Sequence, residues 1–170
     1  VRGVALDRDQ AQMSVRHVPD RPGMAGALCS ALADAGISLD AIVQSERQHR
    51  DGSRDISFIV KREDRAASDQ ALAPLLAQWP GAVLEDGPAI ARVSAVGAGM
   101  PATAGTAGRM FRFLAEAGVN IELIATSEIR TSCVVAESDG IKALEAVHAG
   151  FQLGGPECHQ AQGTESPLEA

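Results

Sequence analysis

The sequence is poor in aromatic side chains, and this shortage limits how its core can be built. Only 3% of the 170 residues are aromatic, with no Tyr and a single Trp. Hydrophobic residues still make up 45% of the chain, which is ordinary for a globular protein. We therefore expect a core of Ala, Leu, Val and Ile, in one domain of usual size or in two small ones.

Cysteine, basic charge and long apolar runs are also scarce. The three cysteines, Cys29, Cys133 and Cys158, form an odd and widely spaced set, which fits neither a disulfide framework nor a zinc site. Cys29 and Cys133 lie in apolar runs of the sequence, so we expect them to be buried and reduced. Reduced thiols indicate a cytoplasmic protein. The formal net charge of -7 argues against nucleic-acid binding and against an anionic membrane surface. No apolar run approaches the length of a transmembrane helix, and the N-terminus has no signal-peptide pattern.

Hydrophobic periodicity predicts an α+β chain in which one order of elements occurs twice. After a short apolar strand at 1–6, the first half reads strand, helix, strand, strand, helix, strand. Its strands are expected at 13–18, 37–43, 56–60 and 82–84, and its helices at 24–35 and between 65 and 79. The second half predicts strands at 90–96, 119–125, 129–136 and 151–153, with helices at 107–117 and 141–149. Residues 154–170 are polar and are expected to form a mobile tail.

A shift of 82 residues places the first half of the sequence on the second without gaps. Gly23 then falls on Gly105, Gly36 on Gly118, and Ile42 on Ile124. A duplicated unit of roughly 75 residues with βαββαβ order is the ferredoxin-like arrangement. In that fold a four-stranded antiparallel sheet carries two helices on one face. Two such units leave sheet edges unpaired, which predicts association within or between chains.

Several segments resemble the C-terminal regulatory region of aspartate kinase, a tandem pair of ACT domains that some bacteria also make as a separate β subunit. The matching segments are Val18-Pro-Asp-Arg-Pro-Gly-Met-Ala25, Gly36 with Asp40-Ala-Ile-Val-Gln44, Asp55-Ile-Ser-Phe58, Ala91-Arg-Val-Ser-Ala-Val-Gly97 and Asn120-Ile-Glu-Leu-Ile-Ala-Thr-Ser-Glu-Ile-Arg-Thr-Ser132. The resemblance covers residues 1–153. Its most specific motifs are Pro-Asp-Arg-Pro-Gly and Thr-Ser-Glu-Ile-Arg.

The resemblance implies a topology that periodicity alone does not show. The first ACT domain, residues 11–87, is expected to be inserted in the second, which comprises residues 1–10 and 88–153. The strand at 1–6 should therefore belong to the sheet of residues 90–153. ACT units of this family pair side by side across a dimer and join their sheets into one of eight strands, so a homodimer is expected.

The resemblance also implies a function. The chain is expected to sense L-threonine and/or L-lysine and to inhibit the phosphorylation of L-aspartate by ATP. It has no Lys-Phe-Gly-Gly-Thr-Ser nucleotide motif, and its histidines show no nucleophile or metal spacing. No catalytic residue, metal or cofactor is therefore expected on this chain. By resemblance, ATP and Mg belong to a kinase domain or to a kinase-containing α chain.

One effector site is predicted around the helix start that follows Gly23. Free backbone N–H groups at a helix start suit a carboxylate. Asp20 could pair with a ligand ammonium, and Gln44 offers an amide to a threonine hydroxyl. The resemblance adds residues of the partner unit. Site 1 then comprises Asp20, Arg21, Pro22, Gly23, Met24, Ala25, Ser38, Leu39, Asp40 and Gln44, with Asn120 and Ile121 from the partner.

A second and weaker site is predicted where an apolar strand breaks into Thr126, Ser127 and Glu128. Hydroxyls and a carboxylate together can satisfy an ammonium and a polar side chain. Gly105 and Met100 complete this set, which we call site 2. Family members usually carry Lys or Arg and then Ser-His-Pro before the glycine, whereas this chain has Pro101-Ala-Thr-Ala104. The effector, and whether both sites are filled, are therefore left open.

Two other functions fit parts of the sequence. An ACT module regulating another amino-acid biosynthetic enzyme is one alternative, and the Thr-Ser-Glu-Ile-Arg stretch argues against it. The other is a nucleotide-cofactor enzyme, since Gly97-Ala-Gly-Met-Pro-Ala102 matches a G-x-G-x-x-A fingerprint. Pro101 removes an N–H that a pyrophosphate would need. A hairpin, rather than a crossover helix, is also expected after the following strand.

Overall fold

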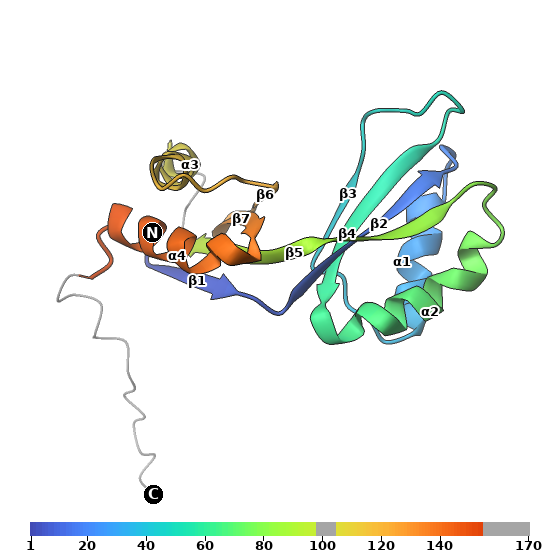
Figure 1. Cartoon of the computed structure of the whole chain (residues 1–170), viewed down its shortest axis with the longest axis horizontal. Coiled ribbons are helices and arrows are strands. Elements are labelled where there is room, and N and C mark those ends of the chain that lie inside the picture. Colours follow the sequence, from blue (N-terminus) through green and yellow to red (C-terminus); the bar gives the residue numbers. More distant parts are fainter. Residues whose placement is uncertain (98–104, 155–170) are drawn as a thin grey trace, which may run out of the picture.

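The computed structural model describes residues 1–97 and 105–154, which fold into two similar units joined by one long strand (Figure 1). The strands are β1 (Gly3–Asp7), β2 (Gln10–Val18), β3 (Ala41–Gln44), β4 (Arg54–Lys61), β5 (Val83–Val96), β6 (Leu123–Thr126) and β7 (Arg130–Ala136). The α-helices are α1 (Met24–Asp34), α2 (Arg65–Leu76), α3 (Thr106–Glu116) and α4 (Gly140–Gly150). The 3-10 turns η1 (Arg62–Asp64) and η3 (Glu137–Asp139) lead into α2 and α4.

Unit 1 is a four-stranded antiparallel sheet with α1 and α2 on one face. Its strand order is β3-β4-β2-β5, and only the first half of β5 takes part. Alternate residues of the strands turn toward the helices, as the period of two requires. Large buried side chains of this core include Met13, Leu28, Leu32, Ile56, Phe58, Leu72 and Trp79. The predicted ferredoxin-like arrangement is confirmed for this half of the chain.

Unit 2 repeats the arrangement, but its outer strand comes from the N-terminus. The strand order is β6-β7-β5-β1, and β1 pairs antiparallel with Arg92–Val96 of β5. Val4 and Leu6 of β1 pack against the core formed under α3 and α4. The N-terminus lies beside α4 in Figure 1. The first unit is thus inserted in the second, which confirms the topology that the family resemblance implied.

Strand β5 belongs to both units, and this corrects the expectation of two separate strands at 82–84 and 90–96. Its 14 residues pair first with β2 and then with β7 and β1. The Asp86-Gly-Pro88 turn signal marks a local irregularity instead of a break, because the register with β2 shifts between Ala11 and Met13. A Cβ on Gly87 would lie 2.9 Å from Gln12 Cβ and from its carbonyl oxygen, so this close approach requires glycine. The sequence-drawn boundary at 87/88 falls inside the strand, and the exact domain limits stay a prediction.

The strand expected at 151–153 is a turn, and β1 occupies the corresponding edge of the sheet. Phe151 instead packs edge-on against Phe113, with 5.2 Å between ring centroids. The strands β3 and β6 are also shorter than expected, since residues 37–40 after Gly36 and 119–122 after Gly118 are not part of the strands. The mobile tail predicted at 154–170 lies outside the described residues, apart from Gly154.

The repeat found in the sequence is reproduced in the two cores. Leu28 and Leu32 of α1 correspond, at the shift of 82 residues, to Met110 and Leu114 of α3, and all four side chains are fully buried. Each helix begins after a glycine with positive φ, 96° at Gly23 and 86° at Gly105. The duplication therefore describes the positions of equivalent core residues as well as the order of elements.

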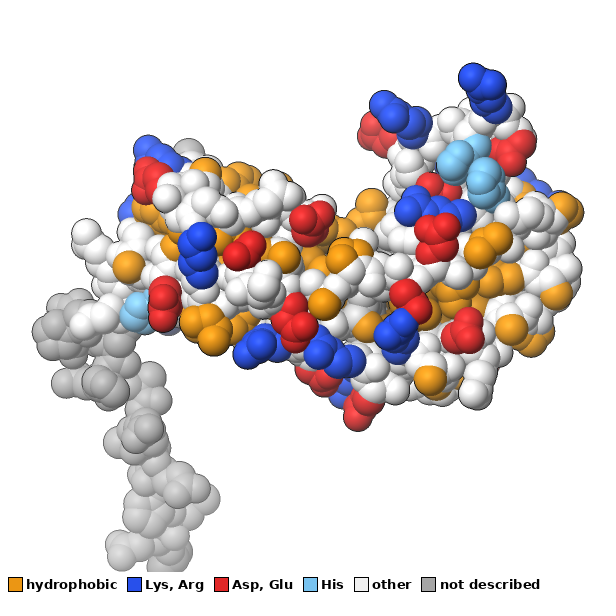
Figure 2. Space-filling view, viewed as in Figure 1, with side chains coloured by type: hydrophobic (Ala, Val, Ile, Leu, Met, Phe, Trp, Pro, Cys, Tyr) orange, Lys and Arg blue, Asp and Glu red, His pale blue; other side chains and the backbone are white. Residues whose placement is uncertain are grey.

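The two units touch through a small apolar cluster and through ion pairs. Ile59 of unit 1 packs with Ile90 and Val134 of unit 2. Arg62 donates to Glu137 and to the carbonyl of Arg8, at 2.8 and 2.9 Å. Figure 2 shows two lobes with a hollow between them and with acidic and basic side chains interspersed on this face. No helix in the described part of the chain is long and apolar enough to cross a membrane.

Candidate functional site

The start of α1 provides the backbone donors that site 1 was expected to have. Gly23 adopts φ 96° at the N-cap, and no side chain caps the helix. The first turn of α1 holds no acidic residue, so its amides and the positive end of the helix dipole remain open to an anion. Met24 and Ala25 are half-buried, whereas Asp20, Arg21 and Pro22 are exposed. This end of unit 1 can accept a carboxylate.

Asp20 lies in the same loop, and its carboxylate is held by two donors. Arg54 Nε donates to Asp20 Oδ2 at 2.8 Å, and Gln48 Nε2 donates to the same oxygen at 2.5 Å. The hydrogen bond from Arg54, followed by that from Gln48, holds the pKa of Asp20 below its usual range. Asp20 is therefore ionised and already partnered.

Gln44 ends β3 and is exposed. It pairs with Ile56 of β4, two residues from the Arg54 that pairs with Val18, so β3 and β2 end at the same end of the sheet. The next residue, Ser45, accepts a hydrogen bond on its carbonyl from Arg54 at 3.2 Å. Arg54 thus connects the strand end at Gln44 with the loop at Asp20. Of the residues predicted for site 1, Asp20 to Ala25 and Gln44 lie at the same end of unit 1.

Ser38, Leu39 and Asp40 lie at the opposite end of unit 1. They follow the C-terminus of α1, whose 11 residues separate the two ends by about 16 Å at 1.5 Å per residue. Together with Gln10 and Arg92 they line a cavity of about 300 Å³. Arg92 donates to Asp40 and also to Asp7 Oδ2, the latter at 3.0 Å. Within one chain these three residues do not join the loop at Asp20.

Asn120 and Ile121 occupy the equivalent end of unit 2. Asn120 donates from Nδ2 to Glu122 Oε1 at 3.2 Å, and Ile121 packs against the unit 2 core. They follow the C-terminus of α3, just as Ser38 and Leu39 follow that of α1. A single chain therefore does not bring them to site 1, and their contribution from a second chain stays a prediction.

Site 2 is described only in part. Gly105 caps α3 with φ 86°, and Thr126 is the last residue of β6. Ser127 N donates to the carbonyl of Arg130 at 2.7 Å, which closes the turn between β6 and β7. Glu128 is exposed in this turn. Met100 and the Pro101 to Ala104 segment lie outside the described residues. Next to the turn is a cavity of about 610 Å³ lined by Arg2, Val96, Gly97, Ser127, Ile129 and Arg130.

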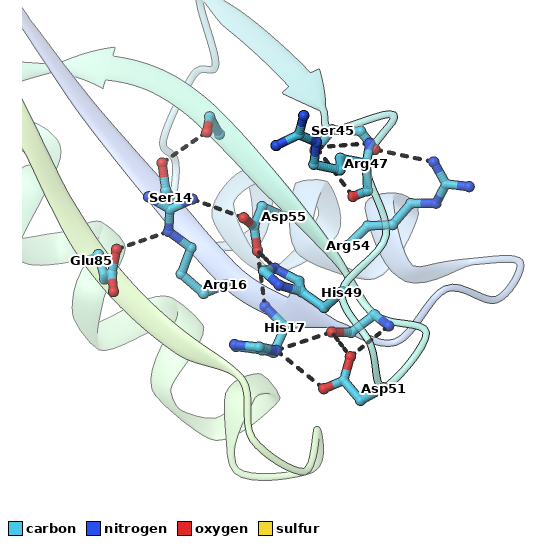
Figure 3. A network of polar contacts seen from close by, with 12 residues as sticks. Ser14, Arg16, His17, Ser45, Arg47, His49, Asp51, Arg54, Asp55 and Glu85 are labelled. Atoms are coloured by element: carbon cyan, nitrogen blue, oxygen red, sulfur yellow. Dashed lines mark hydrogen bonds and ion pairs between the residues drawn. The ribbon is translucent and has the colours of Figure 1, made fainter.

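Sequence reasoning missed a polar network at the base of the β3–β4 hairpin (Figure 3). His49 Nε2 and Arg16 each contact a carboxylate oxygen of Asp55 at 2.8 Å. The rings of His17 and His49 stack with 4.1 Å between centroids. Burial opposes ionisation of Asp55, but hydrogen bonds from His49 and Arg16 outweigh it and hold the pKa of this carboxyl below its usual range. None of the residues in this network was among those predicted for a site.

Asp51 makes this hairpin sensitive to acid. Its carboxylate accepts hydrogen bonds from the hydroxyl and the backbone N–H of Ser53, and these contacts lower its pKa to about 2. Because the pKa is lower in the folded state, the stabilisation is present above about pH 4 and is lost as the pH falls toward 2. We expect the protection factor of the Ser53 amide, which is its intrinsic exchange rate at each pH divided by the measured rate, to fall over this window. Asp51→Asn should abolish that pH dependence, and an unchanged profile in the variant would contradict the assignment.

No group of three or more His, Cys, Asp or Glu side chains that could hold a metal ion occurs among residues 1–97 and 105–154. Cys133 is buried, and burial raises the pKa of its thiol to about 11. Helix α3 is followed by the β6–β7 hairpin instead of a crossover helix, which agrees with rejecting a dinucleotide fold.

Comparison with known proteins identifies both units. Residues 13–77 and residues 93–151 each match a model of the ACT domain. Aspartokinase from Thermus thermophilus is 42% identical over 154 residues, which cover 90% of this chain and 38% of that protein. The chain therefore spans well under half the length of this curated relative.

Two solved structures match over nearly their whole length. The ligand-free regulatory subunit of aspartate kinase from Thermus thermophilus is 40% identical with a TM-score of 0.80, covering 88% of this chain and 97% of that one. A chain in a structure of aspartokinase alpha and beta subunits is 39% identical with a TM-score of 0.79, covering 89% and 98%. The tandem ACT domains, the inserted topology and these relatives together show that this chain belongs to the family of aspartate kinase regulatory regions.

Proposed function

We propose that this chain senses an amino-acid end product, L-threonine and/or L-lysine, and thereby inhibits phosphorylation of L-aspartate in lysine, threonine and methionine biosynthesis. The phosphorylation itself, with ATP and Mg²⁺, is assigned to a kinase domain or a kinase-containing α chain. The observation that carries the proposal is site 1. There, the uncapped amides of α1, the carboxylate of Asp20 and the exposed amide of Gln44 meet at one end of unit 1.

A second copy of the chain would complete this site. The strands β3 and β6 lie at the outer edges of the sheets and expose Ile42, Val43 and Ile124 by 41%, 45% and 49%. Unpaired edges with apolar side chains favour strand addition. Antiparallel pairing of β3 with the partner's β6 would place the end of β3, at Gln44, against the residues that precede β6. Those residues are the predicted partner contribution, Asn120 and Ile121.

The same pairing would also bring Thr126 to Glu128 of site 2 close to Ser38 to Asp40, which were predicted for site 1. The end of the partner's β6, at Thr126 to Glu128, would face the segment that precedes β3, which is Ser38 to Asp40. Each β3–β6 pairing would thus form two composite sites from opposite ends of the two units. An effector held between units stabilises one relative orientation of the domains, and the equilibrium shifts toward that state in proportion to its differential affinity.

Calorimetric titration with L-threonine and with L-lysine tests the proposal directly. We expect saturable heat with at least one of them, together with a larger fraction of dimer in sedimentation experiments, because the ligand would contact both chains. Absence of both heat and a thermal shift with either amino acid would refute the proposal.

Substitution of Gln44 or Asp20 by Ala is expected to weaken effector binding. Loss of one hydrogen bond to a polar ligand group costs about 1 to 1.5 kcal/mol, which is roughly a five- to tenfold increase in Kd. In the assembled kinase the concentration for half-inhibition should rise in parallel. Gln70→Ala, at an exposed position of α2, is the matched control and should leave Kd unchanged. Equal Kd values for all variants would remove Gln44 and Asp20 from the site.

A further inference from the structure

Arg54 is paired with Asp20, the site 1 residue that was expected to pair with a ligand ammonium. Its Cα lies opposite Val18 in the β2–β4 ladder, so its side chain starts close to the loop that contains Asp20. Arg54 Nε reaches Asp20 Oδ2 at 2.8 Å, and the two side chains are only 27% and 29% exposed. The single acidic side chain of this loop is therefore neutralised by the protein itself.

The guanidinium is fixed by more than this ion pair. Arg54 Nη1 donates to the carbonyls of Ser45 and Glu46, at 3.2 and 2.8 Å (Figure 3 shows Arg54 beside Ser45). Gln48 holds the same oxygen of Asp20 from the other side. A planar guanidinium that spans several acceptors loses little further entropy on binding and is not readily displaced.

This arrangement has a consequence for the charge of the ligand. A ligand ammonium near Asp20 can still donate a hydrogen bond to this carboxylate, but it gains little net charge attraction because the charge of Asp20 is already balanced by Arg54. A second ammonium at the end of a side chain would also experience like-charge repulsion from Arg54. An uncharged polar side chain avoids this repulsion and can still bond to the amide of Gln44.

We propose that Arg54 is a specificity-determining residue of site 1, which favours an amino acid with an uncharged polar side chain over a diamino acid. The inference rests on the proposed function of site 1 as an amino-acid site. It assigns the discrimination to an ion pair within one chain, which is separate from whatever the partner contributes.

The test compares Kd for L-lysine and for L-threonine in the full chain and in four variants. Arg54→Ala should lower the ratio of Kd for lysine to Kd for threonine by roughly five- to tenfold, since Asp20 becomes free to pair with the ligand. Asp20→Asn should raise the ratio because Arg54 is left unpaired. The double variant Asp20→Asn with Arg54→Ala restores the charge balance and should return the ratio to its original value.

Arg47→Ala is the matched control, because it removes one positive charge from the same hairpin. The hydrogen bonds that Arg47 makes with Ser45 run through its backbone. The ratio of Kd for lysine to Kd for threonine in Arg47→Ala should equal that of the unaltered chain. Circular dichroism of every variant checks that the fold is retained.

The outcomes separate the inference from the function on which it rests. If the unaltered chain binds an amino acid but Arg54→Ala leaves the ratio unchanged, the role of Arg54 is refuted and the proposed function stands. The role of Arg54 is also refuted if Kd for lysine and Kd for threonine change by the same factor, because a loosened hairpin would have that effect. If Arg54→Ala binds an amino acid while the unaltered chain binds neither L-threonine nor L-lysine, Arg54 blocks the site and the proposed function of the unaltered chain fails. No binding by any variant refutes both.

Discussion

Deletion of residues 1–7 is expected to unfold unit 2 and to leave unit 1 folded. Strand β1 pairs with Arg92–Val96 of β5 over five residues and contributes Val4 and Leu6 to the unit 2 core. Truncation of a single buried aliphatic side chain costs about 2 to 5 kcal/mol, and a whole domain is stable by only about 5 to 15 kcal/mol. Val4 and Leu6 are only partly buried, but their loss together with that of a five-residue ladder is still comparable to the total stability of the unit.

The unit that loses protection from hydrogen exchange is the result that tests the inserted topology. Residues 1–7 directly precede unit 1 in the chain, yet hydrogen exchange should show lost protection in the Ile90–Val96 half of β5, in β7 and in α4, and retained protection in β2 and β4. Deletion of residues 1–2 alone removes one backbone hydrogen bond, from Arg2 N to Val96 O, and should have a small effect. Lost protection in unit 1 with unit 2 intact would contradict the inserted topology.

Arg92→Met is expected to destabilise the chain by about 2 kcal/mol. The Arg92 side chain is only 13% exposed and is paired with Asp7 and Asp40. Burial, and then the nearby charge of Arg130, lowers the pKa of Arg92, while Asp7 opposes that change. Removing one partner of a buried ion pair leaves uncompensated charges and costs about 3 to 5 kcal/mol. We expect a loss below this range because the two carboxylates, Asp7 and Asp40, are 38% and 30% exposed and can be rehydrated.

Arg62→Met is the matched control for this prediction. Arg62 also joins the two units, through Glu137, but its side chain is 48% exposed. Exposed ion pairs contribute about 0 to 1 kcal/mol, so urea unfolding should show a clearly smaller loss than for Arg92→Met. Equal losses in the two variants would mean that burial is not the reason for the importance of Arg92.

Local patterns in the sequence were sufficient for the helices, the two cores and the positions of the glycines. The 82-residue repeat relates Leu32 to Leu114 and Gly23 to Gly105, and the structure gives both pairs equivalent environments. These features depend on the period of a helix or strand and on backbone conformation, which neighbouring residues determine. The start of α1 as an anion-accepting end of site 1 follows from the same local information.

Strand partners and ion pairs across the fold required the tertiary structure. Periodicity detected a strand at the N-terminus, but the resemblance to a family was needed to assign it to unit 2. The single strand β5 was predicted as two strands, at 82–84 and 90–96. The pairing of Asp20 with Arg54 joins residues 34 positions apart. Separation of Ser38 to Asp40 from the loop at Asp20 follows from the direction of α1. The sequence by itself determined which segments are helix or strand and which faces are buried, because those properties are local. Only the tertiary structure decided which charged side chains are already neutralised and which predicted site residues meet, because strand order brings distant residues together.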